Sequence, residues 1–575
     1  MPIHNKDIAD VFEQVADLLE IKGDNPFRIR AYRNAARTVG NLSRNVSDLI
    51  SQEEDLTQYP GVGKDLAGKI EQVATTGGLK LLDRLRRQIP GELSELMKIP
   101  GLGPKRVATM YHELDISKPD QLQKAAEAGE IHELPGFGRK TEQNILDEVK
   151  RLAEEKYHRL KLAEAEQFAK PLIDYLKKAE GIKDIAPAGS YRRCKDTVGD
   201  LDILATCQEG SKLMDRFVDY EDVEKVVSKG QTRSTVLLRS GFQVDLRIVP
   251  QVSYGAALMY FTGSKDHNIA VRKIAVKKNL KLNEYGLFRG KKRIAGKTES
   301  HVYEALGLSF IEPELRENRG EIEAVYNGKG LPDLLTLNDV RGDLHIHTKY
   351  SDGHHTIQQM AEASQNRGYE YIAITDHTKR LAVTGGLNVK DLHKQMKEIE
   401  EVNENTKDMT VLKASEVDIM EDGSLDLPGS VLKELDLTVC VVHYTFGLSK
   451  EKQTERIMKA MDNPYFNILA HPSGRLINER QAYQVDMEKI MKAAKNGSCL
   501  LELNAHPDRL DLDDVHCQMA KEIGVKIVLS TDAHRMDGLD TMRFGVGQAR
   551  RGWLGAEDVA NTRSLKELRE IFNRN

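Results

Sequence analysis

The periodicity of hydrophobic residues changes twice along the chain and divides it into three stretches. Through residues 1–155 apolar residues recur every three or four positions, as in IADVFEQVADLLEI, which is typical of amphipathic helices. Residues 160–330 mix such segments with short runs such as VGDLDILAT and FQVDLRIV, which predict strands. From residue 338 onward strand and helix patterns alternate regularly. We therefore expect an all-helical region, an α+β region and a domain of βα units.

The predicted strands after residue 338 share one property: each ends at, or is followed by, His, Asp or Asn. They are GDLHIHT, YIAITDH, LTVCVVH, FNILAHP, CLLELNA and KIVLSTDAH. In a parallel βα barrel the carboxyl ends of the strands meet on one face, where reactive side chains collect. The pattern predicts a distorted TIM-like barrel with its polar residues gathered on that face.

The chain is long enough for several domains. Its 575 residues exceed what one hydrophobic core supports, and 40% hydrophobic with 30% charged residues is a globular composition. We expect two helical domains at 1–90 and 91–155, α+β segments at 156–255 and 256–318, a linker at 319–337 and the βα domain at 338–575.

Charge is distributed unevenly along the chain. Of 84 Lys+Arg and 89 Asp+Glu, residues 338–575 hold 31 and 38, which leaves 53 and 51 for residues 1–337. A net charge of −5 gives no overall attraction to nucleic acid. Any binding of a polyanion must therefore rest on local groups.

The chain carries no sign of a membrane or export segment. No run reaches the roughly 18 apolar residues of a membrane span, and the start MPIHNKDIADVFEQ lacks the apolar core of a secretion signal. The 5 cysteines are scattered and form no CxxC pair, which is typical of a reducing compartment. We expect a cytoplasmic protein that does not contact membranes.

A short motif recurs three times in the helical region: TQYPGVGKDLAGKI (57–70), MKIPGLGPKRVATM (97–110) and HELPGFGRKTEQNI (132–145). The glycines allow a tight turn and leave the N–H groups of the next helix open to a phosphate. One copy would be a plain turn more often than not, but three favour helix-hairpin-helix elements that hold a DNA backbone without reading sequence. The expected contacts are Gly61, Gly63, Lys64, Gly101, Gly103, Lys105, Gly136, Gly138 and Arg139.

Three aspartates are placed where strands would bring them together. Asp200 and Asp202 alternate with apolar residues in VGDLDILAT, so both carboxylates share one face of the strand. Asp245 lies in the middle of FQVDLRIV, where a lone buried carboxylate would be costly. Three converging carboxylates can hold two Mg²⁺ (or Mn²⁺) ions and support phosphoryl transfer. For the first two acids alone, surface positions on an edge strand are an equal alternative.

Donors suited to a nucleoside triphosphate flank these aspartates. Gly189, Ser190 and Arg193 offer a backbone amide, a hydroxyl and a guanidinium group. Downstream runs Tyr260-Phe261-Thr262-Gly263-Ser264, followed by Asn268 and Arg272 on a predicted helix. On these motifs, over about residues 1–318, the chain closely resembles the family X DNA polymerases of the nucleotidyltransferase superfamily.

The resemblance implies a role for each of these residues. Asp200, Asp202 and Asp245 would be the metal ligands; Gly189, Ser190, Arg193 and Gly199 would contact the triphosphate of a dNTP; Tyr260, Phe261, Gly263 and Asn268 would cradle its sugar and base; and Arg272 would lie near the templating base. It also implies an 8-kDa-like DNA-end-binding domain (1–90), a fingers-like domain (91–155), a palm (156–255) and a thumb (256–318).

Two positions depart from the family pattern. Lys265 stands where several members have an acid beside the incoming base, and Gln243 stands where some have an arginine that orients the third aspartate. These departures bear on fidelity and on the tuning of the metal site rather than on the reaction.

One lysine matches the position at which some family members form a Schiff base and so remove a 5′-deoxyribose phosphate. That chemistry needs an amine of lowered pKa. Alignment on PGVG (60–63) places Lys69 there with Tyr32 as its supporting residue, but Asp65 replaces a basic member of the pocket. The alternatives are a solvated helix lysine, or a pocket that binds the 5′-phosphate at the far edge of a gap through Arg28, Arg33 and Lys64.

Nine potential metal ligands stand in or just after the predicted strands of the last domain. His345 and His347 alternate, so both imidazoles face the same way. A single strand-end histidine is usually structural, but nine nitrogen and oxygen donors need a metal to offset their burial. Such a set can hold up to three Zn²⁺, Mn²⁺ or Fe²⁺ ions and generate a hydroxide for attack on phosphorus. The set is His345, His347, Asp352, His377, Glu416, His443, His471, Asp532 and His534.

Over about residues 338–575 this pattern resembles the PHP (polymerase and histidinol phosphatase) domain, all of whose nine ligand positions are filled here. In that family an intact set implies hydrolytic activity. Asp343 and Asp376 would support the ligands from behind, and Arg475 and Arg509 are candidates to bind a substrate phosphate or to face solvent.

The whole pattern predicts a bacterial family X DNA polymerase fused to a PHP domain. We expect template-directed filling of short gaps in base-excision repair, with 3′–5′ exonuclease or abasic-site endonuclease activity in the PHP domain. The expected partner is gapped or nicked double-stranded DNA, bound by a monomer. Two rival interpretations stay open: a PHP domain that is a phosphatase for small molecules or 3′ ends, or a scaffold that holds DNA ends and has weak catalysis.

Overall fold

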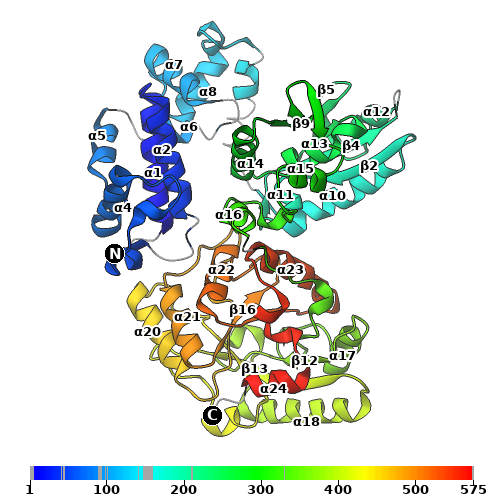
Figure 1. The fold of residues 1–575 in the computed structure, drawn as a ribbon. Coiled ribbons are helices and arrows are strands. Elements are labelled where there is room, and N and C mark those ends of the chain that lie inside the picture. The colour runs from blue at the N-terminus through cyan, green and yellow to red at the C-terminus, as the bar shows by residue number, and fades with distance from the viewer. Residues whose placement is uncertain are drawn as a thin grey trace. The chain divides into compact units, whose positions relative to one another are not determined.

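The computed structural model describes residues 5–40, 42, 46–88, 93–96, 99, 102–139, 141–146, 159–208, 211–328 and 330–572. The chain folds into two compact units, Met1–His158 and Arg159–Asn575 (Figure 1). Among the described helices, none combines the length and apolar character that crossing a membrane requires.

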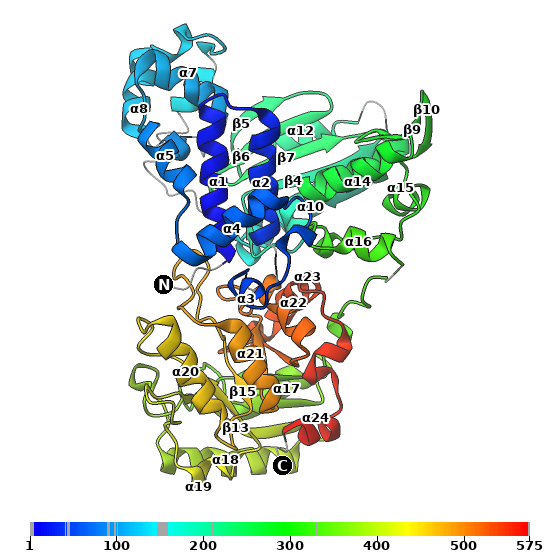
Figure 2. The ribbon, with the colours of Figure 1, turned by 60° about the vertical axis from the view of Figure 1, so that its left-hand side comes forward.

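The first unit is helical, as its periodicity predicts. Helices α1 (Asn5–Ile21) and α2 (Pro26–Gly40) run side by side (Figure 2), and the rings of Phe12 and Tyr32 meet between them at 5.5 Å. One apolar core extends through the unit. The other described helices are α3 (Val46–Ser51), α4 (Lys64–Thr76), α5 (Lys80–Gln88), α6 (Leu93–Leu96), α7 (Pro104–Leu114) and α8 (Pro119–Ala128), with short 3-10 turns at Leu56–Gln58 and Ile131–Glu133. Residues 141–146 are also helical.

The second unit begins with a five-stranded sheet in the order β2-β4-β7-β6-β5. Its inner strands β4 (Asp200–Cys207) and β7 (Gln243–Ile248) are parallel neighbours. Because β4 carries Asp200 and Asp202 and has a strand on each side, the alternative that these acids lie on an edge strand is wrong. The outer strands are β2 (Ile182–Pro187), β5 (Val223–Lys229) and β6 (Arg233–Leu238). Helices α10 (Leu162–Lys177), α11 (Gly189–Arg192) and α12 (Leu213–Val218) accompany this sheet, and β1 (Leu160–Lys161) pairs with β3 (Thr197–Val198).

A small α+β segment follows the five-stranded sheet. Its helices are α13 (Tyr254–Thr262), α14 (Lys265–Lys277) and α15 (Glu299–Ala305), and its sheet has the order β10-β9-β8 (Lys292–Ala295, Gly286–Arg289, Lys281–Asn283). The predicted linker at 319–337 is not an isolated connector. It contains α16 (Glu321–Tyr326), and buried Ile322 and Leu334 pack into the core of this segment.

The last domain is a nearly closed barrel of parallel strands. Seven strands follow one another in sequence order: β11 (Gly342–Ile346), β12 (Tyr371–Ile374), β13 (Thr410–Asp418), β14 (Leu437–Val441), β15 (Ile468–Leu469), β16 (Leu500–Asn504) and β17 (Ile527–Ser530). The amide of His347 donates to the carbonyl of Ala533 at 2.9 Å, which links the end of the first strand to the end of the last. The predicted βα-type barrel is confirmed.

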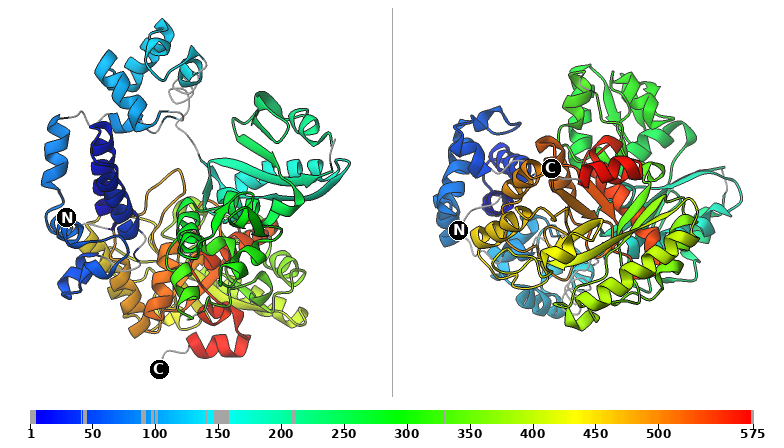
Figure 3. Two further views of the ribbon diagram at one scale, coloured as in Figure 1. Left: turned by 45° about the horizontal axis from the view of Figure 1, so that its top comes forward. Right: turned by 90° about the horizontal axis from the view of Figure 1, so that it is seen from below.

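Helices surround the strands of the barrel (Figure 3). They are α17 (Ile357–Gln365), α18 (Val389–Asn405), α19 (Gly429–Leu432), α20 (Lys450–Met461), α21 (Met487–Asn496), α22 (Asp514–Ile523), α23 (Met542–Arg551) and α24 (Leu565–Phe572). With helices outside and side chains filling the inside, both faces of each strand are buried, which explains the nearly continuous apolar runs in the sequence.

The five-stranded sheet and the barrel share a core. Ile477, Leu510 and Phe544 from the barrel are buried in the same apolar cluster as the helices and strands of the sheet. Beside them the ammonium of Lys161 lies 2.7 Å from both Glu479 and Asp508. The second unit is therefore continuous across the boundary that the sequence pattern suggested near residue 338.

A buried ion-pair network joins the five-stranded sheet to the segment after it. Arg316 is fully buried, and its Nη1 lies 2.6 Å from Glu299 Oε1. The other oxygen of Glu299 lies 2.6 Å from Nη2 of Arg192 on α11. Burial disfavours the charged carboxylate, but the two arginines outweigh it and hold the pKa of Glu299 below its ordinary value.

We predict that Glu299→Gln lowers the free energy of unfolding by about 3 kcal/mol at pH 7, because it leaves a buried guanidinium uncompensated. The single tryptophan, Trp553, packs against the same core, so its fluorescence during urea unfolding provides the measurement. Since the folded pKa is depressed, the difference from the wild type is present above the ordinary pKa of 4.5 and shrinks as the pH falls below it.

Asp174→Asn is the matched control for this prediction. Asp174 pairs with Lys177 at 3.0 Å, and both side chains are more than half exposed. Losing such a surface pair should change stability by less than about 0.5 kcal/mol. A Glu299→Gln variant as stable as this control would contradict the structural role of the network.

Candidate functional site

The repeated glycine turns of the first unit share one geometry. The apolar residue between the glycines is buried in each copy: Val62, Leu102 and Phe137. Gly63 and Gly103 cap the N-termini of α4 and α7 without a side chain, and a Cβ added at either would meet nothing within 4 Å. The turns therefore leave their backbone amides open at exposed helix starts.

Only the first glycine of a turn needs left-handed backbone. Gly61 and Gly136 have φ of +80° and +84°, whereas Gly63 and Gly103 are extended. Lys64, Gly138 and Arg139 are exposed beside their turns. Gly101 and the side chain of Lys105 lie outside the described residues.

The predicted aspartates share the centre of the five-stranded sheet. Asp202 on β4 and Asp245 on β7 are direct neighbours in register, and Asp200 lies two residues before Asp202 on the same strand. Burial, and then the like charges of Asp200 and Asp245, raise the pKa of Asp202 to about 7. A cation bound between these carboxylates would offset their mutual repulsion.

Asp245 is held by three neighbours. Gln243 Nε2 donates to its Oδ2 at 3.0 Å, while Thr235 Oγ1 at 2.5 Å and Arg233 Nη2 at 3.2 Å donate to Oδ1. Gln243 thus orients the third aspartate in this chain, and Arg233 is a further support that the sequence pattern did not reveal.

The glycine-serine turn lies directly against these carboxylates. Gly189 has φ of +62°, and a Cβ built there would lie 2.6 Å from Asp202 Oδ2. Ser190 follows on α11, half-buried. Gly199 is similarly crowded, since its Cβ would meet Arg159 Nη1 at 2.8 Å. The backbone can approach Asp202 at Gly189, and Arg159 at Gly199, only because no side chain intervenes.

A pocket between α13, α14 and β8 gathers part of the predicted nucleotide set. Asn268 Nδ2 donates to the carbonyl of Tyr260 at 2.7 Å, and Arg272 Nε to the carbonyl of Asn268 at 3.3 Å. Phe261 is not a lining residue and packs instead under the guanidinium of Arg247, 4.4 Å from the ring centroid. Gly263 also lies off the pocket, near Arg193. The lining residues are Ala256, Met259, Tyr260, Asn268, Arg272, Leu282 and Asn283.

Lys69 on α4 forms an ion pair with Asp65 one turn earlier. Its ammonium also lies 5.4 Å from the centroid of the Tyr32 ring. Burial favours the neutral amine, but the partners Asp65 and Tyr32 outweigh it and raise the pKa of Lys69 above its ordinary value. This is the direction opposite to the one that a Schiff base requires.

All nine predicted ligands of the barrel meet at the carboxyl ends of its strands. Three groups of donors each have their ligand atoms within 4.8 Å of one another, and His347 and His377 each belong to two groups. His471 joins them, with Nε2 at 3.2 Å from Glu416 Oε1. The groups are His347, Asp352, His377 and His534; His345, His347 and Asp532; and His377, Glu416 and His443.

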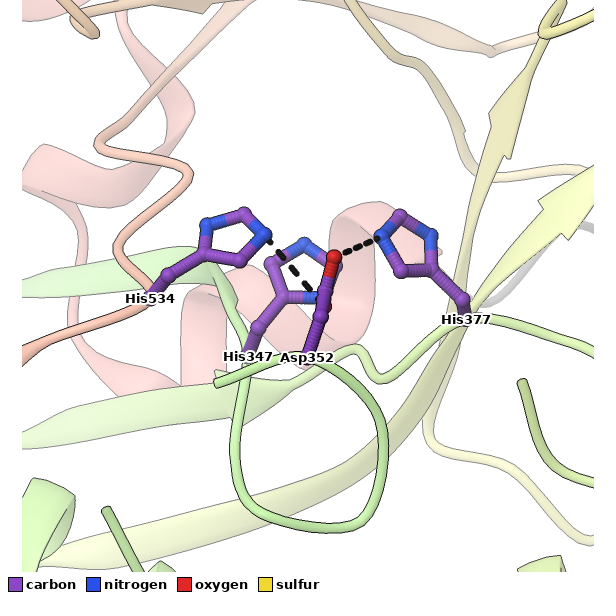
Figure 4. Close-up of side chains that lie close together, drawn as sticks. All are labelled: His347, Asp352, His377 and His534. Atoms are coloured by element: carbon purple, nitrogen blue, oxygen red, sulfur yellow. Dashed lines mark ion pairs between the residues drawn. The ribbon is translucent and has the colours of Figure 1, made fainter. Parts of the chain in front are cut away.

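Figure 4 shows three imidazoles, those of His347, His377 and His534, around the carboxylate of Asp352. Asp352 lies 3.4 Å from a nitrogen of His377 and 3.4 Å from one of His534. Two residues of the nine, His471 and Asp532, have φ of +26° and +56°. Non-glycine residues adopt such backbone rarely, and chiefly at functional sites.

The donor set fits divalent cations. Both ring nitrogens of His347 are buried and have no hydrogen-bond partner in the described part of the chain, although Asp532 lies only 3.2 Å from one of them. Burial, and then the neighbouring His534 and His377, lower the pKa of His347 to about 3, so its ring is neutral and can ligate a metal. Buried nitrogens without partners are costly unless a cation accepts their lone pairs.

Five profiles of protein families match the chain. They are a helix-hairpin-helix domain (residues 3–79), a SAM-like helix-hairpin-helix tandem (93–151), the DNA polymerase beta palm (159–241), the DNA polymerase beta thumb (257–317) and the PHP domain (343–506). The chain is also 35% identical over 577 residues to the DNA polymerase/3′-5′ exonuclease PolX of Bacillus subtilis (strain 168), a match that covers 100% of both chains.

The chain belongs to the family X DNA polymerases with a C-terminal PHP domain. Two further relatives each match only part of this chain. The DNA polymerase lambda of Rattus norvegicus is 26% identical over 344 residues, 55% of this chain and 56% of its own length. A probable phosphatase of Thermoanaerobacter sp. (strain X514) is 33% identical over 208 residues, 33% of this chain and 78% of its own.

One side chain of the PHP centre escaped the sequence analysis. Glu502 on β16 is fully buried and accepts from His345 Nδ1 at 2.7 Å, from the amide of His471 at 2.6 Å and from Ser530 Oγ at 2.6 Å. It sits in the middle of the apolar run CLLELNA, the same signal that identified Asp245. The bond to His345 leaves the other nitrogen, Nε2, free to face a metal.

Asp343 and Asp376, which were predicted to support the PHP ligands, accept hydrogen bonds from backbone amides and not from the imidazole rings. Asp343 accepts from the amide of Thr531 at 3.1 Å, and Asp376 from the amide of Thr348 at 2.8 Å. The two arginines differ. Arg475 donates to Asp196 and to the carbonyls of residues 509 and 510. Arg509 lies 3.4 Å from Asp532, and its buried Nη1 has no hydrogen-bond partner among the residues that the structure describes.

The ion pair with Asp65 should lower the reactivity of the Lys69 amine towards acetylation. In Asp65→Asn the pKa of Lys69 should fall, because its anionic partner is gone, and acetylation of Lys69 at pH 8 should accelerate about threefold to tenfold. Peptide mass spectrometry after timed labelling measures the rate. Lys80, exposed on α5, is the internal reference and should react equally in both proteins. An unchanged rate at Lys69 would contradict the pairing.

Proposed function

We propose that this chain is a template-directed DNA polymerase that fills short gaps during repair and carries a 3′–5′ exonuclease in its PHP domain. The observation that carries the proposal is the presence, in one unit, of three aspartates on neighbouring palm strands and of nine potential metal ligands at the carboxyl ends of the barrel strands. A relative matched over its whole length is named as a polymerase and 3′-5′ exonuclease.

In the palm, Asp200, Asp202 and Asp245 would hold two Mg²⁺ or Mn²⁺ ions. Such cations offset the charge of the triphosphate and lower the pKa of the attacking hydroxyl when bound. The chain supplies the positioning. Gly189 brings backbone against Asp202, Ser190 and Arg193 donate toward a triphosphate, and Gln243 with Arg233 fixes Asp245.

The pocket between α13, α14 and β8 is the proposed place of the incoming nucleotide. Tyr260, Asn268 and Arg272 form a connected wall, because each binds the next through a backbone carbonyl or ring contact. Arg272 would reach the templating base in the minor groove. Phe261 and Gly263, which lie off the pocket, would shape the turn above it rather than touch the base.

In the PHP domain the nine ligands would hold up to three ions of Zn²⁺, Mn²⁺ or Fe²⁺. Such ions supply Lewis-acid activation of water and of a phosphodiester when bound. Glu502 orients His345, and the free Nη1 of Arg509 is placed to bind a phosphate oxygen of the strand being cut. Arg475 is committed to protein partners and takes no part in this.

DNA would be held by the three glycine turns, whose exposed amides and basic side chains suit a phosphate backbone of any sequence. A gapped duplex offers two ends, and Arg28, Arg33 and Lys64 of the predicted pocket lie with Lys69 in the domain that would meet its 5′-phosphate. Arg33 is already paired with Asp17 and Glu20, at 2.8 and 2.7 Å. The raised pKa of Lys69 favours this electrostatic role over a lyase.

A second candidate for the PHP domain is a phosphatase, for 3′ ends or small molecules. It is favoured by the relative named as a probable phosphatase, which matches about a third of this chain. Cleavage of a simple phosphomonoester, compared with a primer bearing a mismatched 3′ terminus, distinguishes the two. Faster release of nucleotides from the mismatched primer supports the exonuclease.

The proposal predicts that the two activities separate. Asp200→Ala should reduce primer extension on a gapped duplex at least about a hundredfold and leave exonuclease activity unchanged, because only the palm loses a ligand. His345→Ala should reduce exonuclease activity by a similar factor and leave primer extension unchanged. Both rates are measured on the same labelled duplex, with and without dNTPs.

His393→Ala is the matched control, since this histidine is exposed on α18 of the PHP domain and belongs to none of the three ligand groups. It should retain both activities. If both catalytic variants lost both activities while their unfolding curves matched the wild type, the assignment of two independent sites would be wrong.

A further inference from the structure

The last residue of helix α23 in the PHP domain reaches the proposed triphosphate site of the palm. The side chain of Arg551 is 3% exposed, and its Nη1 donates to the backbone carbonyl of Arg193 at 2.9 Å and to Glu317 Oε1 at 2.9 Å. The helix is packed closely there. A Cβ built at Gly547 would lie 3.1 Å from that of Cys194, the residue after Arg193.

One carboxylate oxygen is shared by two arginines. Glu317 Oε1, which accepts from Arg551, also accepts from Nε of Arg193 at 3.0 Å. Burial opposes ionisation of Glu317, but Arg551 and Arg193 outweigh it and hold the pKa of this carboxyl well below its usual range. Glu317 is therefore a fixed anion between a guanidinium of the palm and one of the PHP domain.

The remaining bonds of Arg193 fix the direction of its guanidinium. Nη1 donates to the carbonyl of Thr262 at 2.5 Å, and Nε is bound to Glu317. Its third nitrogen, Nη2, donates to none of the described residues, so it is the donor left for a ligand. Both the backbone and the side-chain partner of Arg193 are thus held by Arg551.

Arg551 also sets the local charge. Without it, Glu317 would neutralise Arg193 one to one. The set joined by these ion pairs contains three arginines and two carboxylates, which gives it a net charge of +1: Arg193, Arg551, Arg319, Glu317 and Asp514. Within this set the positive charge of Arg193 is therefore not cancelled, which favours the binding of a triphosphate.

We propose that Arg551 of the PHP domain is a positioning residue for nucleotidyl transfer in the palm, acting through Glu317 on Arg193. The proposal rests on the polymerase function proposed above. It makes the PHP domain a structural part of the nucleotide site, in addition to any hydrolysis of its own. Arg551 touches no substrate and exerts its effect on the affinity for the incoming nucleotide.

The test is steady-state extension of a gapped duplex by the full-length enzyme, with dNTP as the varied substrate. Arg551→Met should raise KM for dNTP about tenfold, the effect of one charge-assisted bond. The values of kcat and of the exonuclease rate should stay within about twofold. The control is Arg543→Met, on the same helix, because Arg543 pairs with Glu166 across the same interface without touching Arg193 or Glu317. Its KM should match the wild type.

A double variant tests the route of the effect. Arg193→Ala alone should raise KM, and adding Arg551→Met should raise it no further, since coupled residues are not additive. The proposal would be overturned if the effects of the two substitutions on KM multiplied in the double variant. It would also be overturned by a KM for Arg551→Met within twofold of the wild type. A general loss of folding would instead lower the exonuclease rate as well.

If Arg551→Met does not fold, Arg551→Lys provides the second measurement. It keeps the charge but cannot donate to Glu317, Asp514 and the Arg193 carbonyl together, so a rise in KM of severalfold is expected and an unchanged KM overturns the proposal. A wild-type enzyme unable to extend the primer would overturn the polymerase function itself. A wild-type enzyme that extends it normally, with KM insensitive to Arg551, would overturn only the role of this residue.

Discussion

The cost of burying charge and lone pairs without partners governs both sites of this protein. In the palm, burial and then the like charges of Asp200 and Asp245 raise the pKa of Asp202 to about 7. In the PHP domain, His347 has two buried nitrogens with no hydrogen-bond partner among the described residues. A folded chain tolerates such groups only if something else satisfies them, and a bound divalent cation would do so at both places. The order of the strands brings these side chains together within each domain.

Much of this could be predicted from the sequence, for a simple physical reason. A strand has a period of two, so Asp200 with Asp202, and His345 with His347, had to share a face once their segments were strands. The carboxyl ends of parallel strands meet, which brought nine ligands together from about 190 residues of chain. The family resemblance and the barrel are confirmed on these grounds.

What could not be predicted depends on neighbours across strands and domains. Arg233 and Glu502 support ligands from other strands, and no local pattern marks their partners, although the lone acid of CLLELNA was a usable sign. Residues 319–337 were predicted to be a linker, but α16 within them packs into a hydrophobic core. Its few apolar residues contact a surface that is formed by earlier parts of the chain. The shared core and ion pairs between palm and PHP domain are equally invisible to periodicity, yet they place Arg551 beside the nucleotide site.

The central claim is that the buried constellation of the PHP domain is a cation centre and not a network of hydrogen bonds. Anomalous X-ray diffraction from crystals of the purified protein, collected at the Zn, Fe and Mn edges, tests this most directly. Anomalous peaks are expected within the three ligand groups, with His347 and His377 each beside two of them. Crystals grown with these metals present but showing no peak there, with the imidazoles hydrogen-bonded to one another and to the carboxylates, would contradict it.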